Sequence, residues 1–371
     1  MGSQNARFIG GRHDFGRIGS VARQVVRPTL ALAAMILCLA AANAFGQTAK
    51  ILTVAPPGAK VAGQFSTVQD AVTAAPETGA EIRIEPGEYR EVVHIDKPNI
   101  QLRGMGSDAS KVVIVYANGA SNTCGTSCSA TVFETGDNFI ATNLTIANDW
   151  SKTGKPRTQA LALSISGDRA VLRNVRLLGA QDTLLATSKG CRTGGSGADG
   201  APPTDCKIAR QFYDHCYIEG EVDFIFGNAK AVFEECEIHS IAHPAGGFLT
   251  ANGRSKVDED SGYVFDHCTL TAEPEVTNIF LGRPWRDYAK VVFMNTKMGA
   301  HIVPAGWSEW HKGETERLKT AYYAEYNNSG PGAHAGEREE LAHMLTAAEA
   351  KQFETKAWLG GADGWDPTRV K

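Results

Sequence analysis

Residues 210–229 read RQFYDHCYIEGEVDFIFGNA and are the most informative stretch of the chain. Within this stretch, the run VDFIFG places one carboxylate, Asp223, among β-branched and aromatic residues that are typical of a buried strand. Burial of an unpaired carboxylate is costly unless a cation or several hydrogen-bond donors accompany it. Asp223 is therefore either a structural aspartate that backbone donors satisfy or a functional group with partners elsewhere in the chain.

The beginning of this stretch belongs to a pattern that recurs from residue 139 onward: FIATNLTI, AVLRNVRL, QFYDHCYI, AVFEECEI, YVFDHCTL and VVFMNTKM. The fifth residues of these segments lie 20 to 41 residues apart and are Asn143, Asn174, His215, Glu235, His267 and Asn295. Repeats of this length that each supply strands indicate a solenoid. Strands with little room for crossover helices favour an all-β parallel β-helix. A β-sandwich is the alternative, but it would not require a fixed register.

Shorter elements are expected before and after these repeats. Residues 66–75 have the pattern of a short amphipathic helix with Ser66 or Thr67 as its N-cap. Residues 346–353 are expected to be helical and to begin a segment that covers the solenoid. Four stretches between Gly, Pro, Asn or Asp residues are expected to be strands: 81–84, 91–95, 100–102 and 111–116.

The N-terminal segment has the composition of a secretory signal peptide. Five arginines and a single acid accompany an apolar run over residues 28–44, which ends in the cleavage pattern Ala-Asn-Ala. A membrane anchor is the alternative, but the run is short for a membrane span. We therefore expect a signal peptide at 1–44 and one β-helix domain at 45–371, secreted to the periplasm or outside the cell, with no membrane association after cleavage.

Removal of this segment changes the net charge from −4 to −8, which argues against nucleic-acid binding. Seven cysteines remain, so at least one thiol is unpaired. A Cys124–Cys128 disulfide would close a small loop, and a Cys191–Cys206 disulfide would pin a Gly-rich loop inserted at 186–207. None of these spacings is typical of zinc, and we expect no metal ion.

Three further cysteines, Cys216, Cys236 and Cys268, each lie one residue after a repeat marker and should therefore stack on neighbouring coils. Either Cys216–Cys236 or Cys236–Cys268 fits the Cα separation that a disulfide allows, and the sequence leaves this choice open.

The repeat register also brings two carboxylates together. Asp182 lies eight residues after Asn174, and Asp223 lies eight residues after His215. Because adjacent strands run about 4.8 Å apart, the two carboxylates should be neighbours on one face. Two carboxylates at such a distance do not ionise equally, so one favours an acid role and the other a base or nucleophile. The segment LGRPW offers Arg283 as a cation for this pair.

Together these segments resemble the pectin methylesterases, carbohydrate esterases with a right-handed parallel β-helix. The resemblance rests on GAQDTL from Gly179, on the 210–229 stretch and on LGRPW from Leu281, with further agreement in GQFSTVQDAV, TQALAL and YNNSGPGA. It runs in the family's order from about residue 50 to about residue 365. The 210–229 stretch is highly specific, whereas GAQDTL and LGRPW are specific in its company.

The resemblance implies a role for each candidate residue. Asp223 would attack the methyl-ester carbonyl of galacturonate and form an acyl-enzyme, and Asp182 would be the general acid and then the general base. Arg283 would hold Asp223 ionised. The amides of Gln159 and Gln181 would form the oxyanion hole. Trp285 and Phe224 would stack on sugar rings.

The resemblance implies no cofactor. We expect the protein to be a monomer and its partner to be the homogalacturonan of pectin. Ala180 departs from the family pattern, in which an aromatic residue commonly precedes Gln-Asp. This difference would alter the wall of the cleft.

Other enzyme classes fit the sequence less well. A lyase would need a cluster of acidic calcium ligands, and an inverting glycosidase would need more widely spaced carboxylates. The remaining alternative is a related β-helix that binds carbohydrate or hydrolyses another ester.

Overall fold

The computed structural model describes residues 50–59, 63–190 and 206–370. The chain divides into two compact units, residues 1–48 and residues 49–371, and the second is described here by itself. The expected signal peptide at 1–44 lies outside the described residues, as does Cys191. Among the helices of the described ranges, none combines the length and the apolar character needed to cross a membrane.

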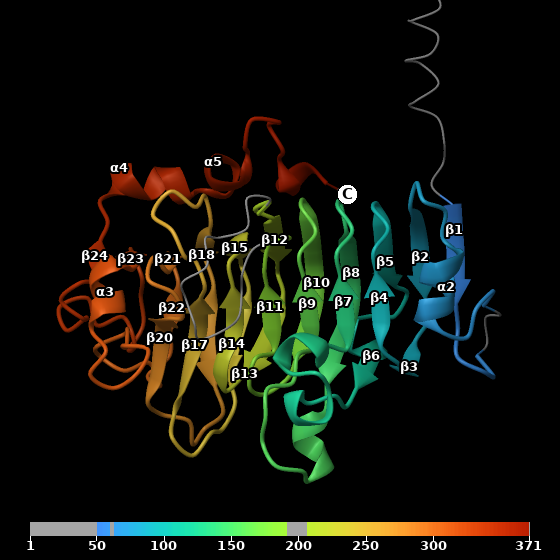
Figure 1. Ribbon diagram of the computed structural model, residues 1–371, viewed down its shortest axis with the longest axis horizontal. Helices are drawn as coiled ribbons and strands as arrows, with labels where there is room; N and C mark the ends of the chain where they lie inside the picture. The colour runs from blue at the N-terminus through green and yellow to red at the C-terminus, as the bar shows by residue number, and fades with distance from the viewer. Residues whose placement is uncertain (1–49, 60–62, 191–205, 371) are drawn as a thin grey trace, which may run out of the picture. The chain divides into compact units, whose positions relative to one another are not determined.

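The described unit consists of parallel strands that follow one another in chain order, as the colours of Figure 1 show, and that pair into two sheets. The smaller sheet has seven strands. Its strands, each paired in parallel with the next, are β4 (Val93–Ile95), β7 (Val132–Glu134), β9 (Leu163–Ile165), β11 (Leu184–Ala186), β14 (Val222–Gly227), β17 (Gly247–Asn252) and β20 (Ile279–Pro284).

The other strands form a 17-stranded network and complete the coils. They are β1 (Lys50–Val54), β2 (Ala80–Ile84), β3 (Gly87–Arg90), β5 (Ile100–Gly104), β6 (Val112–Tyr116), β8 (Ile140–Asn148), β10 (Ala170–Leu178), β12 (Arg210–Asp214), β13 (Tyr217–Gly220), β15 (Lys230–Glu234), β16 (Glu237–Ser240), β18 (Gly262–Asp266), β19 (Thr269–Ala272), β21 (Lys290–Met294), β22 (Lys297–Met298), β23 (Tyr322–Tyr326) and β24 (His343–Met344). This arrangement confirms the predicted parallel β-helix, although the strand expected at 91–95 begins only at Val93.

The six repeat markers share one backbone conformation, which explains why the repeat keeps its register. Each marker has a positive φ between 49° and 58°, so the chain turns a corner there in the left-handed region. Asn tolerates this region better than most residues do. Asn side chains also link coils, because the amide of Asn174 donates to Asn143 Oδ1 at 2.8 Å and that of Asn327 donates to Asn295 Oδ1 at 2.8 Å.

The interior of the coils is filled by side chains that stack in the same register. Tyr213, Phe233, Phe265 and Phe293 form a continuous column of rings with centroids 4.4 to 4.5 Å apart. Trp307 is buried at one end of this core, where it stacks on Tyr323 at 4.0 Å. Offset or stacked aromatic pairs of this kind stabilise a core beyond the area that they bury.

Cysteines also stack in the core, but not as expected. Cys216, Cys236 and Cys268 lie on successive coils, and all three are buried free thiols, so the expectation of a disulfide among them is wrong. The backbone N–H of Cys216 contacts the sulfur of Cys236 at 3.3 Å. Burial raises the pKa of Cys216 and Cys236, which keeps these thiols protonated and unreactive.

The two predicted disulfides outside this stack have different outcomes. Cys124 and Cys128 form a disulfide with a Cα–Cα distance of 5.5 Å, as expected. Cys206 is also disulfide-bonded, and its expected partner lies outside the described residues.

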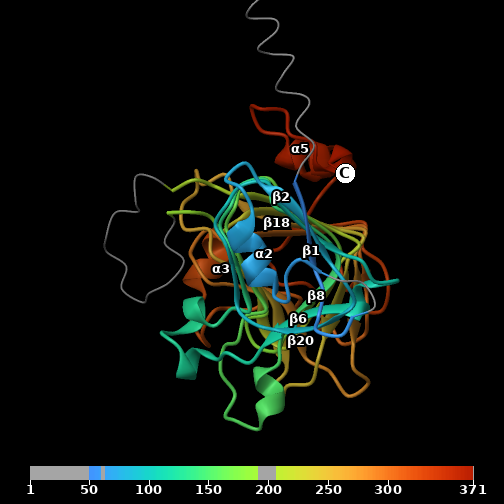
Figure 2. The same cartoon turned by 90° about the vertical axis from the view of Figure 1, so that its right-hand side faces the viewer.

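Helices lie at the margins of the coils. The predicted N-terminal helix is α2 (Val68–Ala74), capped by the Thr67 side chain, and it packs Val68, Ala71 and Val72 into the core at the β1 end (Figure 2). The remaining helices are α3 (Glu316–Thr320), α4 (Ala347–Ala350) and α5 (Thr355–Leu359). Thr346 caps α4 through a capping box, and α4 leads into a 3-10 turn over Lys351–Phe353, which agrees with the predicted helical stretch.

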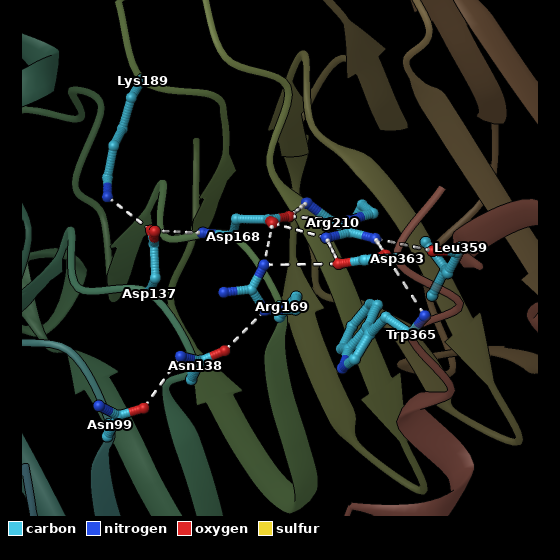
Figure 3. Close-up of polar contacts among 10 residues, drawn as sticks. All are labelled: Asn99, Asp137, Asn138, Asp168, Arg169, Lys189, Arg210, Leu359, Asp363 and Trp365. Carbon is cyan, nitrogen blue, oxygen red and sulfur yellow. Dashed lines mark hydrogen bonds and ion pairs between the residues drawn. The ribbon is translucent and has the colours of Figure 1, made fainter. Parts of the chain in front are cut away.

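The C-terminal segment covers the outer face of the larger network, as predicted. Phe353, Trp358 and Leu359 pack against Phe212 and its neighbours in a second apolar cluster. Arg210 ties this segment to the coils, because its guanidinium binds Asp168 at 2.7 Å and Asp363 at 2.6 Å (Figure 3).

Candidate active site

Asp182 and Asp223 occupy equivalent places on neighbouring coils. Asp223 lies on β14, and Asp182 lies two residues before β11, so the pairing of Leu184 with Ile225 sets the aspartates side by side. The backbone N–H of Asp182 donates to the carbonyl of Val222 at 3.1 Å. Both aspartates have a positive φ, 65° and 50°. Their exposed fractions are 8% and 6%, so the fold removes both carboxylates from most of the solvent.

Arg283 lies on β20, two strands from β14 in the seven-stranded sheet, and reaches Asp223. Its Nε and Nη2 atoms donate to the two carboxylate oxygens of Asp223 at 2.9 and 2.7 Å. The guanidinium lies between two rings, 4.1 Å from the centroid of Phe248 and 4.4 Å from that of Trp310. Cation–π contacts and the two-pronged ion pair fix its position from three sides.

The surroundings affect the pKa values of the two carboxylates differently. Burial, together with the charge of Asp223, raises the pKa of Asp182 well above its usual range, and Arg283 opposes this rise. Burial raises the pKa of Asp223 as well, but the hydrogen bonds and charge of Arg283 counteract it directly. Asp182 therefore holds a proton more readily than Asp223, which favours an acid at Asp182 and a carboxylate at Asp223.

Two amide side chains face the same space. Gln181 directly precedes Asp182, and its backbone carbonyl accepts from the N–H of Ala160 at 3.1 Å. Gln159 comes from the preceding coil, and its Oε1 accepts a hydrogen bond from the Thr158 hydroxyl at 3.2 Å. Because this contact engages the oxygen of the Gln159 amide, its nitrogen is the end that can donate to a ligand.

The aspartates open into a cleft of about 510 Å³. Its walls contain all five polar candidates together with Trp285, as the sequence led us to expect. The residues that line it are Cys124, Gly125, Thr126, Ser127, Gln159, Gln181, Asp182, Leu185, Asp223, Phe226, Ala251, Arg283, Trp285 and Trp310.

Phe224, which we expected to stack on substrate, does not line this cleft. Its side chain is 0% exposed and belongs to the interior core. As the strand neighbour of Asp223, Phe224 points to the opposite face. Beyond Phe224 the alternation is interrupted, because Asp223 has a positive φ and the pairing of β14 with β17 shifts between Val222 and Ile225. Phe226 takes the outward position instead and meets Trp285 edge to face at 5.8 Å.

Three further features of the cleft were not assigned from the sequence. Trp310 lines the wall of the cleft whereas Trp307 is in the core, so the two tryptophans of residues 306–310, GWSEW, have separate roles. Phe248 lies beneath the Arg283 guanidinium. The Cys124–Cys128 loop, which includes a short 3-10 turn at Thr126–Cys128, forms part of the rim. Alternation along a strand could have identified Phe248, but no local signal in the sequence places a loop over a distant coil.

Ala180 contributes to a small neighbouring hollow rather than to the cleft itself. This hollow is also lined by Trp150, Arg157 and Glu221, and Arg157 forms an ion pair with the buried Glu221 carboxylate. In the described ranges, no group of three or more His, Cys, Asp or Glu side chains is arranged to hold a metal ion.

Comparison with known proteins agrees with this architecture. The family model described as Pectinesterase matches residues 52–191 and 205–362. The chain is 34% identical over 309 residues to "Putative pectinesterase 14" of Arabidopsis thaliana, and the match covers 81% of this chain and 85% of that protein.

Solved structures with the same fold include a pectin methylesterase from carrot, with a TM-score of 0.75 and 30% identity, in a match that covers 88% of this chain and 98% of that one. Another is a pectin methylesterase in complex with hexasaccharide VII, with a TM-score of 0.69 and 26% identity over 87% of this chain and 100% of that one. A family match that spans most of the sequence, together with these relatives, identifies the chain as a member of the pectinesterase family.

Proposed function

We propose that this protein hydrolyses the methyl esters of pectin by covalent catalysis, with Asp223 as the nucleophile and Asp182 as the general acid and base. The observation that supports this proposal most directly is the pair of buried carboxylates in one register, of which Asp223 accepts hydrogen bonds from Nε and Nη2 of Arg283. Membership of the pectinesterase family supports the choice of a methyl ester as the bond that is broken.

In the first half of the reaction, a carboxylate oxygen of Asp223 attacks the carbonyl carbon of the galacturonate methyl ester. The carbonyl oxygen becomes an oxyanion, which the amide N–H groups of Gln159 and Gln181 stabilise. Collapse of this intermediate breaks the bond to the methoxy oxygen. Asp182 donates its proton to that oxygen, so methanol leaves and an anhydride joins the sugar to Asp223.

In the second half, Asp182 is ionised and accepts a proton from water. The resulting hydroxide attacks the sugar acyl carbon, the anhydride bond breaks, and Asp223 leaves as a carboxylate. Arg283 favours this departure because it already pairs with both oxygens of Asp223. The net reaction consumes one water and yields methanol and a galacturonic acid group, which releases its proton to solvent, with both aspartates restored to their starting protonation states.

Aromatic rings next to the carboxylates provide the sugar-binding surface. Trp285 and Phe226 form an edge-to-face pair in the wall of the cleft, and the ring of Trp310 packs on the Arg283 guanidinium. Flat apolar surfaces with a few polar groups between them suit the faces of pyranose rings. A related pectin methylesterase has been solved with a hexasaccharide, which supports an oligomeric ligand for this cleft.

We further propose that the protein is exported as a monomer and that residues 1–44 act as its cleaved signal peptide. The basic and then apolar composition of these residues supports export. Disulfide bonding at Cys124, Cys128 and Cys206 supports an oxidising compartment, since cytosolic proteins rarely keep such bonds.

The test is methanol release from highly methylated polygalacturonate, with reducing ends and unsaturated products measured in the same samples and with a chelator present. Methanol without chain cleavage is the expected result. Chain cleavage, or release of acetate from an acetylated polymer in place of methanol, would refute the proposed reaction.

A further inference from the structure

The cleft is one part of a longer row of outward-facing residues on the seven-stranded sheet. Pairing between neighbouring strands contributes one residue of each strand to this row. From β20 to β4 the row contains Arg283, Ala251, Phe226, Leu185, Ser164, Phe133 and His94. The first four of these residues line the cleft, and the last three continue the row toward the N-terminal coils.

The far end of the row borders a second hollow, of about 380 Å³, between α2 and the sheet. His94 and Phe133 line it, and their rings stack with centroids 4.6 Å apart and an angle of 3° between their planes. His94 is exposed and Phe133 is partly exposed, whereas their strand neighbours Val93 and Val132 are buried in the core. The two stacked rings therefore lie on the outer side of the sheet.

The position of these rings is fixed by contacts from α2. The Gln69 side chain accepts from the backbone N–H of His94 at 2.7 Å and donates to the backbone carbonyl of His94 at 3.4 Å. The Lys97 ammonium donates to the carbonyls of Thr73 and Ala75 at 2.8 and 2.7 Å. These bonds hold β4 against the helix, so the ring pair is organised before any ligand arrives.

Phe133 connects the second hollow to the apolar cluster that lines the active site. Phe133 packs against a cluster that includes Leu185 and Phe226, and Trp285 packs against the same cluster. Ser164, which has a small side chain, is the row residue between Phe133 and Leu185.

The spacing suits an extended polymer. At about 4.8 Å per strand, Phe133 lies roughly 14 Å along the sheet from Phe226, and His94 lies roughly 19 Å from it. A sugar over the ring pair would therefore be several residues away from the sugar whose ester reacts at Asp223.

We propose that His94 and Phe133 form a distal subsite that binds a sugar ring of the galacturonan chain while another residue of the same chain lies at Asp223. This inference rests on the proposed function, because the ligand is the polymer named there. The subsite contributes affinity for long chains and takes no part in the chemistry.

The test compares wild type with Phe133→Ala and His94→Ala, using Tyr116→Ala as a matched control that removes a 37% exposed ring from the other sheet network. KM for methanol release is measured with a methylated trisaccharide and a methylated decasaccharide. In parallel, calorimetry gives the Kd for unmethylated decagalacturonate, and thermal melts check the fold. Because His94 is exposed, His94→Ala remains informative if Phe133→Ala is poorly folded.

Both subsite variants should raise KM and Kd for the decasaccharide by about three- to tenfold, the range expected for one lost aromatic contact, and leave the trisaccharide KM unchanged. The control should match wild type. An equal rise for both lengths, or no rise at all, would overturn the subsite. If wild type releases no methanol, the proposed function fails, and calorimetry alone then tests the subsite. Unchanged affinity of the variants for decagalacturonate, or no binding of it by wild type, would overturn the inference.

Discussion

Arg283 and Asp223 are joined by two parallel hydrogen bonds, at 2.9 and 2.7 Å, although 60 residues separate them in the sequence. The strand register makes this contact possible, because β14, β17 and β20 are consecutive neighbours in one sheet. The rings of Phe248 and Trp310 on the guanidinium then leave it little freedom to turn elsewhere. The nucleophile proposed here is thus held by a cation whose orientation is fixed.

Arg283→Lys tests the importance of this geometry. Lysine keeps the charge but cannot make the paired contact or stack in the same way, so we expect kcat to fall by about tenfold or more. The acidic limb of the pH profile should also move to higher pH, because burial raises the pKa of Asp223 and the lysine opposes that rise less well. Arg103→Lys, at an exposed surface arginine, is the control. An unchanged profile would show that the paired contact is dispensable.

Asp182→Asn tests the acid and base role. Loss of a positioned general acid should lower kcat about 10²- to 10⁴-fold. In wild type, activity should fall as pH rises through the raised pKa of Asp182, because the acid is then lost before methanol departs. The variant has no such proton to lose, so its alkaline limb should disappear from the kcat profile. Persistence of that limb would assign it to another group.

Glu134 should make stability depend on pH. Burial raises its pKa from 4.5 to about 8, so the folded state keeps a proton that the unfolded state has lost. Stability from this group is therefore present at low pH and decreases as pH rises from 4.5 to about 8, by at most about 1.4 kcal/mol per pH unit. Glu134→Gln should be less pH-dependent in urea unfolding and more stable than wild type at pH 8. The exposed change Glu77→Gln should leave the wild-type dependence intact.

Asp363→Asn tests the attachment of the C-terminal cover. The change removes an ionic partner of Arg210 but leaves Asp168 and the nearby ring of Trp365 in place (Figure 3). Hydrogen exchange should therefore increase in residues 355–370, with a small effect on the global melting temperature because the Asp363 side chain is 44% exposed. Asp258→Asn provides an exposed control. Equal exchange in the two variants would mean that apolar packing alone holds the segment.

The repeat markers explain how much of the fold could be predicted. Asn143, Asn174 and the other markers turn the chain in the left-handed region on every coil, so one local requirement recurs at intervals that the sequence displays. The same register predicts that Asp182 lies beside Asp223, as it does in the structure. Long-range contacts that follow from the strand register can thus be predicted from the sequence.

The predictions that the structure contradicts have local physical explanations. Phe224 directly follows Asp223, so strand alternation turns it away from the cleft, and the irregular backbone at Asp223 then brings Phe226 rather than Ile225 to the cleft face. The stacked cysteines were expected to include a disulfide because their coils are close enough, but proximity does not determine oxidation, and Cys216, Cys236 and Cys268 are thiols. Trp310 and the 124–128 loop reach the cleft through irregular segments whose paths no periodicity describes.

The most direct test of the account is to trap the covalent intermediate on Asp223. Wild-type enzyme is mixed with methylated oligogalacturonate, quenched in acid within milliseconds and analysed by peptide mass spectrometry, with Asp223→Ala treated in the same way. The account predicts that the peptide containing Asp223 gains the mass of the sugar acyl group in wild type alone, and that Asp223→Ala folds but releases no methanol. An acyl group on another residue, or methanol release by Asp223→Ala at about 1% of the wild-type rate or more, would contradict it.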